Sequence, residues 1–504
     1  MQHKAKTSLC FLACVSLRML VSTTPEAQAQ TQKPNVLLII VDDLGPMLRC
    51  YGDSKAITPH IDELAAKGIL FRDHYCQTAI CAPSRQSMLT GLRPDRIGTY
   101  DLDDRFREKM PGSLTLPEYF KKEGYRTLSL GKVFHNGTND QQSWSEPAWW
   151  PVYPFHEYIN QEALGVLKKE KRRLAKIDKA YIPENLPGNL TSWGKKRESW
   201  QSADIADEYL ADGKIARKAT AVLREAGEQP FFLAVGFLKP HLPLVAPQKY
   251  FDQHPREKFV RPATSSFPRG SPTIASTGSK ELRGFTDILT QGELTAEKKI
   301  ELIRAYYACV SFVDAQIGKI IQALKTNNLE KNTIIVLWGD HGFSLGENDL
   351  WGKRTNFEAA THSPLIMVAP QGKFSGRVVK KLVESVDIFP TLCSLAGLSP
   401  PHGLAGEDLI PQIQKKKEGK KAVFSQISRG IHPSGPHENI SAMGYSVRTK
   451  RYRYTQWKKS NGEVLDHEFY DYDQKGENIN VVDSPAYRQI IHEMKKLVEA
   501  YAQF

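Results

Sequence analysis

The chain has 504 residues, of which 40% are hydrophobic and 25% are charged, and its formal net charge is +12. This composition is typical of a globular protein with a large core, and it excludes a low-complexity chain. The positive excess favours encounter with anionic partners; because nucleic-acid binding would rest on that charge alone, we reject it.

The N-terminal residues have the features of a secretory signal. Lys4 and Lys6 precede an apolar stretch, Leu9–Val21, and an Ala-Gln-Ala sequence ending at Ala29 supplies small residues for cleavage. We therefore predict a signal peptide over residues 1–29 and a secreted or periplasmic protein. The apolar stretch is shorter than the roughly 20 residues that a membrane anchor needs, so we predict no integral membrane segment in the mature chain.

Cleavage of this signal leaves an odd number of cysteines without regular spacing. The remaining cysteines are Cys50, Cys76, Cys81, Cys309 and Cys393. Such a set does not make a disulfide scaffold. One cysteine must therefore be free, modified or paired between chains.

Short apolar runs rich in β-branched residues alternate with helical patterns along the mature chain. The runs have the character of buried parallel strands and lie at Asn35–Val41, Thr127–Leu130, Phe231–Phe237, Thr333–Trp338 and Leu365–Ala369. The helical patterns lie at His60–Lys67, Leu116–Glu123, Asp204–Ala226 and Ala296–Lys325. This alternation predicts an α/β fold with a central, mostly parallel sheet, whose chemistry gathers beyond the carboxyl ends of the strands.

The remaining stretches are irregular or change in texture. We interpret Asn136–Asn189 as long loops over the site, and Phe251–Gly292 is also irregular. After roughly residue 415, short alternating segments and a terminal helix, Ala486–Ala502, predict a smaller antiparallel sheet beside the main domain. The predicted parts of the mature chain are a main domain over residues 30–415 and a C-terminal subdomain over residues 416–504.

Polar side chains follow four of the predicted strands. In chain order these strand ends carry Asp42 and Asp43, Lys132 and His135, Lys239 and His241, and Asp340 and His341. Because the carboxyl ends of parallel strands meet at one edge of a sheet, we expect these side chains to lie together. One such strand end is commonplace, but four together predict a site.

The residues Cys81-Ala82-Pro83-Ser84-Arg85, followed by Leu89–Asp95, resemble the signature of the type I sulfatases. In that family the cysteine is oxidised to formylglycine, so the resemblance implies a partner that does this: a formylglycine-generating or anaerobic sulfatase-maturating enzyme. It also implies an alkaline-phosphatase-like α/β sandwich in which residues 30–415 form the catalytic domain. The alternative, a buried structural cysteine at a helix start, does not account for the extended match.

A formylglycine residue suits the hydrolysis of sulfate esters, whose negative oxygens repel nucleophiles. Its hydrate has two hydroxyl groups: one attacks sulfur and expels the alcohol, and deprotonation of the other releases sulfate. A serine is also able to attack, but it has no such route to release sulfate.

This chemistry calls for a divalent cation, which makes the attacking oxygen more acidic and offsets the sulfate charge. Asp42, Asp43 and Asp340 are hard oxygen ligands that suit one calcium or magnesium ion. The resemblance assigns the ion to these three residues, to Cys81 in its formylglycine form, and to His341. The alternative for Asp42 and Asp43, a helix cap at a strand end, does not account for their partners.

Further polar residues have catalytic counterparts in the family. Lys132 and Lys353 are able to neutralise sulfate oxygens, and Arg85 is able to hold the diol. His135 resembles the base of the elimination step, and His241 resembles the histidine that contacts sulfate and assists the leaving oxygen together with Lys353. The division of acid and base roles between the two histidines stays open. Taken singly, each of these residues is more often an ordinary surface or core residue.

Several segments resemble the iduronate-2-sulfatase branch of the family. They include the lysine-to-histidine spacing after the second strand and residues 239–243, 339–353, 361–365 and 386–390. Tyr100 also matches, and we predict that it binds substrate together with Arg354, which is able to meet a carboxylate. Gly98, Phe343 and Arg354 depart from the branch, so the identity of the sugar stays open.

The resemblance therefore predicts a sulfuric ester hydrolase that removes sulfate from a sulfated, uronate-containing polysaccharide or oligosaccharide. One alternative is a phosphoester or phosphonate monoester hydrolase of the same superfamily, because sulfate and phosphate esters differ more in charge than in shape. The other is a non-catalytic glycan-binding protein in which Cys81 is never oxidised, although such a protein has no need of an elimination base.

Overall fold

A computed structural model of the chain describes residues 33–151, 198–259, 266–430 and 440–501. The predicted signal peptide and most of the predicted loops at Asn136–Asn189 lie outside these residues.

A seven-stranded sheet carries four adjacent parallel strands. In spatial order its strands are β11 (Arg377–Glu384), β2 (Ile69–Tyr75), β10 (Leu365–Val368), β7 (Thr333–Gly339), β1 (Asn35–Val41), β5 (Phe231–Phe237) and β3 (Arg126–Gly131). The last four of these run parallel, and β11 and β2 form a second parallel pair. Both faces of β1 are buried, which explains its unbroken apolar sequence. The predicted mostly parallel sheet is confirmed.

The direction predicted for Leu365–Ala369 is wrong. β10 is antiparallel to both β7 and β2. The chain leaves β7 at its carboxyl end and returns to that edge at Pro364, whose carbonyl oxygen accepts a hydrogen bond from Gly339 N (3.0 Å). Because the chain re-enters the sheet from the edge at which β7 ends, β10 must run back against it.

Two strands, β2 and β11, have no counterpart among the predicted apolar runs. β2 is interrupted by the charged residues Arg72 and Asp73, and β11 exposes Lys380 and Lys381 on its outer part. β11 lies at the edge of the sheet, where charged side chains are common and hide the apolar pattern.

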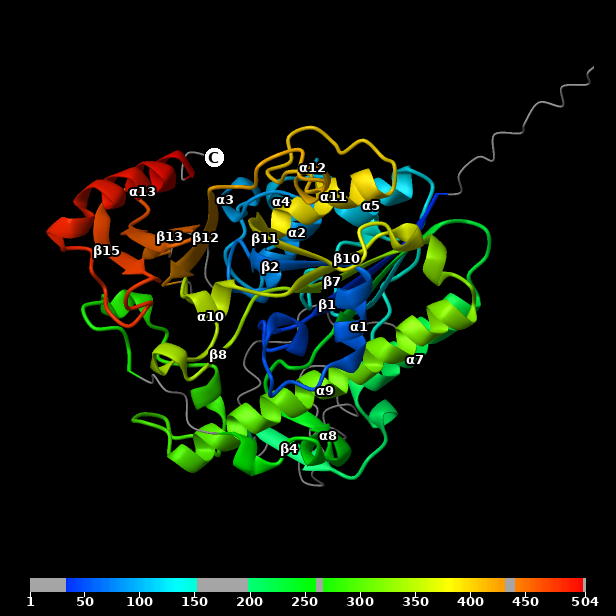
Figure 1. Cartoon of the computed structure of the whole chain (residues 1–504), viewed down its shortest axis with the longest axis horizontal. Helices are drawn as coiled ribbons and strands as arrows, with labels where there is room; N and C mark the ends of the chain where they lie inside the picture. The colour runs from blue at the N-terminus through cyan, green and yellow to red at the C-terminus, as the bar shows by residue number, and fades with distance from the viewer. Residues whose placement is uncertain (1–32, 152–197, 260–265, 431–439, 502–504) are drawn as a thin grey trace, which may run out of the picture. The chain divides into compact units, whose positions relative to one another are not determined.

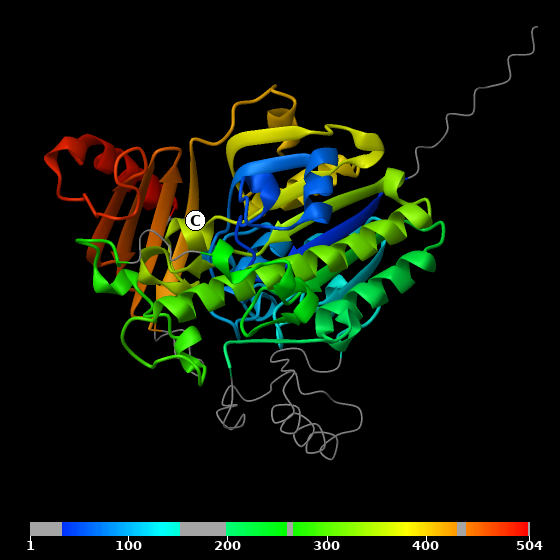
Figure 2. The ribbon, with the colours of Figure 1, turned by 60° about the horizontal axis from the view of Figure 1, so that its bottom comes forward.

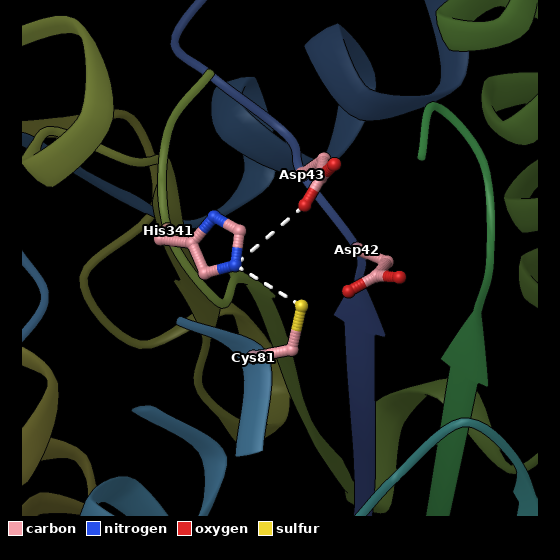
Figure 3. A group of neighbouring side chains, drawn as sticks. All are labelled: Asp42, Asp43, Cys81 and His341. Atoms are coloured by element: carbon pink, nitrogen blue, oxygen red, sulfur yellow. Dashed lines mark hydrogen bonds and ion pairs between the residues drawn. The ribbon is translucent and has the colours of Figure 1, made fainter. Parts of the chain in front are cut away.

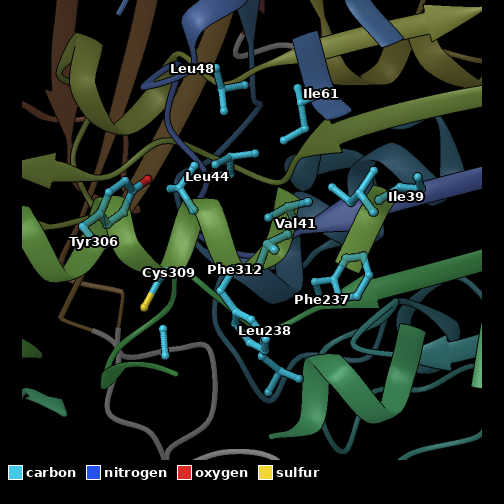
Figure 4. Packing of buried hydrophobic residues seen from close by; sticks show 14 of the residues in the cluster. Ile39, Val41, Leu44, Leu48, Ile61, Phe237, Leu238, Tyr306, Cys309 and Phe312 are labelled. Carbon is cyan, nitrogen blue, oxygen red and sulfur yellow. The ribbon is translucent and has the colours of Figure 1, made fainter. Parts of the chain in front are cut away.

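Helices cover both faces of this sheet (Figure 1). One layer contains α1 (Pro59–Lys67), α7 (Ala211–Arg224) and α9 (Ala296–Thr326), and the other contains α2 (Cys81–Thr90), α5 (Leu116–Lys122) and α11 (Ile388–Leu395). Alternate residues of β1 serve the two layers, because successive side chains of a strand point to opposite faces. Figure 4 shows part of the first core, to which Val41 of β1, Phe237 of β5 and Phe312 of α9 contribute.

The helix predicted at Asp204–Ala226 begins later than expected. Asp207–Tyr209 forms a single 3-10 turn, Leu210 is extended, and α7 starts at Ala211. The Asp207 carboxylate in this turn pairs with Lys249 (2.8 Å) and Lys319 (2.9 Å).

Shorter elements fill the connections. They are α3 (Pro94–Ile97), α4 (Phe106–Lys109), α8 (Gln248–Asp252), α10 (Glu358–Thr361), α12 (Ile410–Ile413), the parallel pair β4 (Trp200–Ala203) and β6 (Leu244–Pro247), and the antiparallel pair β8 (Ser344–Leu345) and β9 (Trp351–Gly352).

The C-terminal residues form a separate four-stranded antiparallel sheet with a helix on one face (Figure 2). Its elements are β12 (Ala422–Arg429), β13 (Ala442–Thr449), β14 (Tyr452–Lys458), β15 (Val464–Asp471) and α13 (Arg488–Tyr501). Met494 and Val498 of α13 pack against Val447, Tyr454 and Phe469. The predicted antiparallel sheet is confirmed, whereas the boundary between residues 415 and 416 stays a prediction.

Candidate active site

Three of the four adjacent parallel strands deliver buried polar residues to one edge of the sheet. β1 leads into Asp42 and Asp43, β3 leads into Lys132, and β7 leads into Asp340 and His341. All five side chains are at most 1% exposed. Buried charges need partners, so their mutual contacts determine what this cluster can do.

Helix α9 supports the turn that aims Asp43 into the cluster. Asp43 has a φ of 60°, which is unusual for a residue with a side chain. The buried Tyr306 hydroxyl donates a hydrogen bond to the Asp43 carbonyl oxygen (2.7 Å) and accepts one from Gly45 N (2.9 Å). Tyr306 of α9 thus helps to fix the backbone that orients the Asp43 carboxylate. The apolar pattern of α9 does not indicate this role.

Cys81 is the first residue of α2, a helix whose residues are all buried. The positive end of the helix dipole therefore lies at Cys81, where it favours negative charge. Burial, with a contribution from Asp42, raises the pKa of the Cys81 thiol to about 11. All five cysteines within the described residues are free, as the absence of a disulfide framework predicts.

Arg85, one turn along α2, contacts the cluster through its guanidinium group. Its guanidinium donates to Asp340 Oδ2 (2.9 Å) and to Asp42 Oδ1 (3.0 Å), and it also bonds the carbonyl oxygens of Lys132 and Val133. The side chain is fully buried. This arrangement makes Arg85 a fixed link between two carboxylates that come from different strands.

Four side chains form a group that is able to hold a metal ion (Figure 3). Asp42, Asp43, Cys81 and His341 each place one ligand atom within 4.8 Å of the others. His341 Nε2 is 3.3 Å from Cys81 Sγ and 3.6 Å from Asp43 Oδ1. His341 Nδ1 is 3.0 Å from the Gly342 carbonyl oxygen, so the proton belongs on Nδ1 and the Nε2 lone pair faces the group.

Asp340 lies directly beside this group. Its Oδ1 accepts hydrogen bonds from Asp43 N (3.1 Å) and His341 N (3.0 Å), and its Oδ2 is 3.7 Å from His341 Nε2. Asp340 therefore connects the ends of β1 and β7, and one of its oxygens remains within reach of the same centre.

Two lysines balance the buried carboxylates. Lys353 Nζ is 2.7 Å and 2.9 Å from the two oxygens of Asp43 and 3.5 Å from Cys81 Sγ, and Lys132 Nζ pairs with Asp42. Burial opposes ionisation of Asp42, but Lys132 and Arg85 hold its pKa well below the ordinary value. Burial instead raises the pKa of Asp43 well above the ordinary value, although Lys353 opposes this. Asp42 and Asp43 thus differ in pKa. A cation bound beside them would stabilise the charged form of Asp43, which burial disfavours.

Two histidines adjoin the cluster. Burial lowers the pKa of His241 to about 3, with Lys353 acting in the same direction and Asp42 and Glu281 against it. Burial, followed by Lys132, also lowers the pKa of His135 well below its ordinary value. A low pKa keeps the His135 imidazole available as a neutral base. The low pKa of His241 means that a proton on its ring needs the support of a neighbouring carboxylate.

Glu281, which no predicted motif contains, also reaches this cluster. Its Oε1 is 3.3 Å from His241 Nε2, and its Oε2 is 3.7 Å from Lys353 Nζ. Although burial opposes its charge, Lys353 and His241 lower the pKa of Glu281 to about 2. The residue lies in the irregular stretch Phe251–Gly292, where neither periodicity nor a motif signals it.

The two predicted substrate residues differ in their surroundings. Arg354 follows Lys353, is 39% exposed at its side chain and pairs with Asp101 (3.1 Å). The Tyr100 hydroxyl is engaged by Asp95, which together with burial raises its pKa. Arg354 thus offers a partly exposed cation next to the cluster, whereas Tyr100 is tied to another carboxylate.

Comparison with known proteins identifies the family. Residues 34–398 match the Sulfatase family. The chain belongs to the sulfatase family. Residues 346–503 of the sulfatase also match the C-terminal region of N-sulphoglucosamine sulphohydrolase.

Curated relatives extend along nearly the whole sulfatase. Human iduronate 2-sulfatase is 31% identical, with 91% of this chain and 90% of the human protein covered. A sulfatase of Formosa agariphila is 32% identical, with 91% of this chain and 85% of that protein covered. The chain is a type I sulfatase of the iduronate-2-sulfatase-like kind, and it is a sulfuric ester hydrolase.

Solved structures confirm the expected alkaline-phosphatase-like fold. Phosphonate monoester hydrolase of Agrobacterium radiobacter matches with a TM-score of 0.70 at 23% identity, with 93% of this chain and 96% of that one covered. Within the part of the chain that the structure describes, no helix combines the length and apolarity needed to cross a bilayer.

Proposed function

We propose that this sulfatase removes sulfate from a sulfated, uronate-containing glycan and that Cys81 is matured to formylglycine for this purpose. The surroundings of residue 81 carry the proposal: its sulfur lies 3.3 Å from His341 Nε2 and 3.5 Å from Lys353 Nζ, at the start of α2. A sulfate ester at this point would meet positive charge from a lysine and from a helix N-terminus. The proposal includes export of the protein and a formylglycine-generating or anaerobic sulfatase-maturating enzyme as its partner.

The thiol itself is a poor nucleophile. With a pKa of about 11, Cys81 is protonated at neutral pH, and the thiolate is the reactive form of cysteine. A hydrated aldehyde in its place supplies an oxygen nucleophile and a route for releasing sulfate.

The donor set fits a hard divalent cation. We assign one calcium or magnesium ion to Asp42, Asp43 and Asp340, with His341 and residue 81 completing the site. When bound, the ion supplies positive charge that acidifies the attacking oxygen and offsets the sulfate charge. The Nε2 lone pair of His341 faces this centre, which supports its place in the set.

The chain's own residues supply the remaining charge and proton transfers. Lys132 and Lys353 face the sulfate oxygens, and Arg85 keeps Asp42 and Asp340 in register. We assign to His241, beside Lys353, the proton that the leaving oxygen takes up. His135, whose pKa is held well below its ordinary value by desolvation and by Lys132, accepts the proton when sulfate is released.

The substrate class rests on charge and on the relatives. The net charge of +12 favours a polyanion, and the partly exposed Arg354 is placed to meet a carboxylate. Two similar curated proteins are named iduronate 2-sulfatase, which supports a uronate-containing glycan.

Defined heparan, dermatan and ulvan oligosaccharides test this proposal. We expect release of sulfate from at least one uronate-containing member, measured by ion chromatography, and none with a Cys81→Ala control. Release only from uronate-free sulfate esters would overturn the substrate assignment while leaving the sulfatase chemistry intact.

A phosphonate or phosphate monoester is the alternative substrate, since a phosphonate monoester hydrolase shares the fold. Turnover of 4-nitrophenyl sulfate, 4-nitrophenyl phosphate and a phenylphosphonate monoester separates the two. We expect the sulfate ester to give the highest kcat/KM; a preference for either phosphorus ester would favour the alternative.

A further inference from the structure

Glu281 is held at the cluster by a loop that is anchored on both sides. Two residues before it, the buried Ser279 accepts a hydrogen bond from Trp351 N (2.8 Å) through its Oγ. One residue after it, Leu282 is 2% exposed and belongs to the main core. Trp351 itself lies two residues before Lys353, so this hydrogen bond joins the loop of Glu281 to the segment of Lys353. The backbone on either side of Glu281 is therefore anchored, whereas its side chain is 36% exposed and is held by its contacts with His241 and Lys353.

The ring of His241 lies between two hydrogen-bond acceptors. Its Nδ1 is 2.6 Å from the Leu242 carbonyl oxygen, and its Nε2 is 3.3 Å from Glu281 Oε1. A neutral imidazole carries one proton, so it satisfies one of these acceptors and points a lone pair at the other. Only the doubly protonated ring is able to donate a hydrogen bond to both acceptors.

We propose that Glu281 is a positioning residue that orients His241 and stabilises the protonated form of its ring, which donates to the leaving oxygen. This inference rests on the proposed role of His241. The proton moves from Nε2 to the oxygen of the alcohol as its bond to sulfur breaks, and water later restores it. At 3.3 Å the contact with Glu281 is long for a charge-assisted hydrogen bond, so the Nε2 hydrogen is available to an incoming oxygen.

Other charged groups around His241 act on it in both directions. Lys353 and Lys132 disfavour its positive charge, and Asp42 favours it. Asp42, however, is already paired with Lys132 and Arg85. Glu281 thus supplies a carboxylate in direct contact with the ring, and its removal leaves His241 facing Lys353 without that compensation.

The first test is the titration of His241 in the matured, metal-loaded enzyme. We expect Glu281→Gln to lower the protonated fraction of the His241 ring at any given pH, as loss of a neighbouring opposite charge does. Nuclear magnetic resonance of 15N-histidine-labelled protein measures this, with the His241 signals assigned by their absence in His241→Asn. An unchanged titration would overturn the proposal.

The second test separates proton donation from a structural role. An acid must be protonated, so a lower pKa moves the alkaline fall of kcat/KM to lower pH. The loss in Glu281→Gln should also be at least about tenfold greater for phenyl sulfate than for 4-nitrophenyl sulfate, because the poorer leaving group needs the proton more. Equal losses, or a gain of activity from removing a competing anion, would contradict the proposal.

Matched variants distinguish this inference from the one on which it rests. Glu257→Gln removes an exposed carboxylate from the same stretch and should change neither readout, whereas Glu281→Asp should restore part of both. If His241→Asn retained full activity, the proposed role of His241 would fail. If it lost activity while Glu281→Gln left the titration unchanged, only the role of Glu281 would fail.

Discussion

Asn136 heads an Asn-Gly-Thr glycosylation sequence immediately after His135. Its carbonyl oxygen is 3.2 Å from His135 Nδ1, and Thr138 closes the turn by donating from N (3.0 Å) and Oγ1 (2.9 Å) to the His135 carbonyl oxygen. The Asn136 backbone is thus held next to a residue to which we assign proton transfer. A branched glycan there would block the approach of a polysaccharide.

We therefore predict that Asn136 stays unglycosylated when the protein is expressed in a eukaryotic secretory host. Glycopeptide mapping measures this, and the other sequences of this kind, at Asn189 and Asn439, lie outside the described residues and serve as internal references. Full occupancy of Asn136 in an enzyme that keeps its activity would remove His135 from the mechanism.

Single residues were predictable where a motif and a strand end coincide. Asp42, Asp340 and His341 follow buried parallel strands, so both the pattern and the topology place them at one edge. Glu281 lies in a loop without periodicity, and only the folded structure brings it to His241. Tyr306 is likewise indistinguishable from any other apolar residue of α9 until its hydroxyl meets the Asp43 turn.

The C-terminal sheet is joined to the active-site segment by a buried ion-pair network. Arg453 of β14, 1% exposed at its side chain, pairs with Glu358 (2.7 Å) and Glu477 (3.1 Å) and bonds the Asn356 carbonyl oxygen. Glu358 begins α10, five residues after Lys353. The second sheet therefore supports the segment that carries Lys353.

Arg453→Leu should lower the free energy of unfolding by about 3 kcal/mol at neutral pH, because it leaves the largely buried Glu477 without its arginine and leaves Glu358 with Arg448 alone. Urea denaturation measures this. Lys459→Met, which removes an exposed pair with Glu463 from the same sheet, should cost less than about 1 kcal/mol. Equal effects of the two variants would show that the network does not hold the sheets together.

The difference in the free energy of unfolding between the native protein and Arg453→Leu should also depend on pH. Burial opposes ionisation of Glu358, but Arg448 and Arg453 hold its pKa well below its ordinary value of 4.5. The stabilisation is thus complete above about pH 4.5 and is lost as the pH falls through the lower, folded value. The difference in the free energy of unfolding between the native protein and Arg453→Leu should therefore decrease as the pH falls below about 4.5.

Elements were predictable where they are buried on both faces or strongly periodic. β1, β5, β7 and α9 lie within a residue or so of their predicted bounds, because an unbroken apolar run or a long helical pattern leaves little choice. The direction of β10 depends instead on where the chain re-enters the sheet, which local sequence does not encode. β11 was hidden because its edge position exposes lysines.

The whole molecule is expected to gain stability from its metal as well as activity. A ligand that binds only the folded state at 100 times its Kd adds about 2.7 kcal/mol. Chelation should therefore abolish turnover and lower Tm, and calcium or magnesium should restore both. Asp340→Asn, which keeps the shape and removes a charge, should lose this response; restoration by zinc alone would mean that the ligands are not a hard-oxygen set.

The central claim, that residue 81 acts as formylglycine, is tested most directly by mass spectrometry of active enzyme. The tryptic peptide Asp73–Arg85 contains both Cys76 and Cys81, so the buried, free Cys76 is an internal control for an unmodified cysteine. We predict that fragment ions place a loss of about 18 Da at residue 81 alone, as aldehyde formation requires. Unmodified cysteine at residue 81 throughout an active preparation would contradict the mechanism.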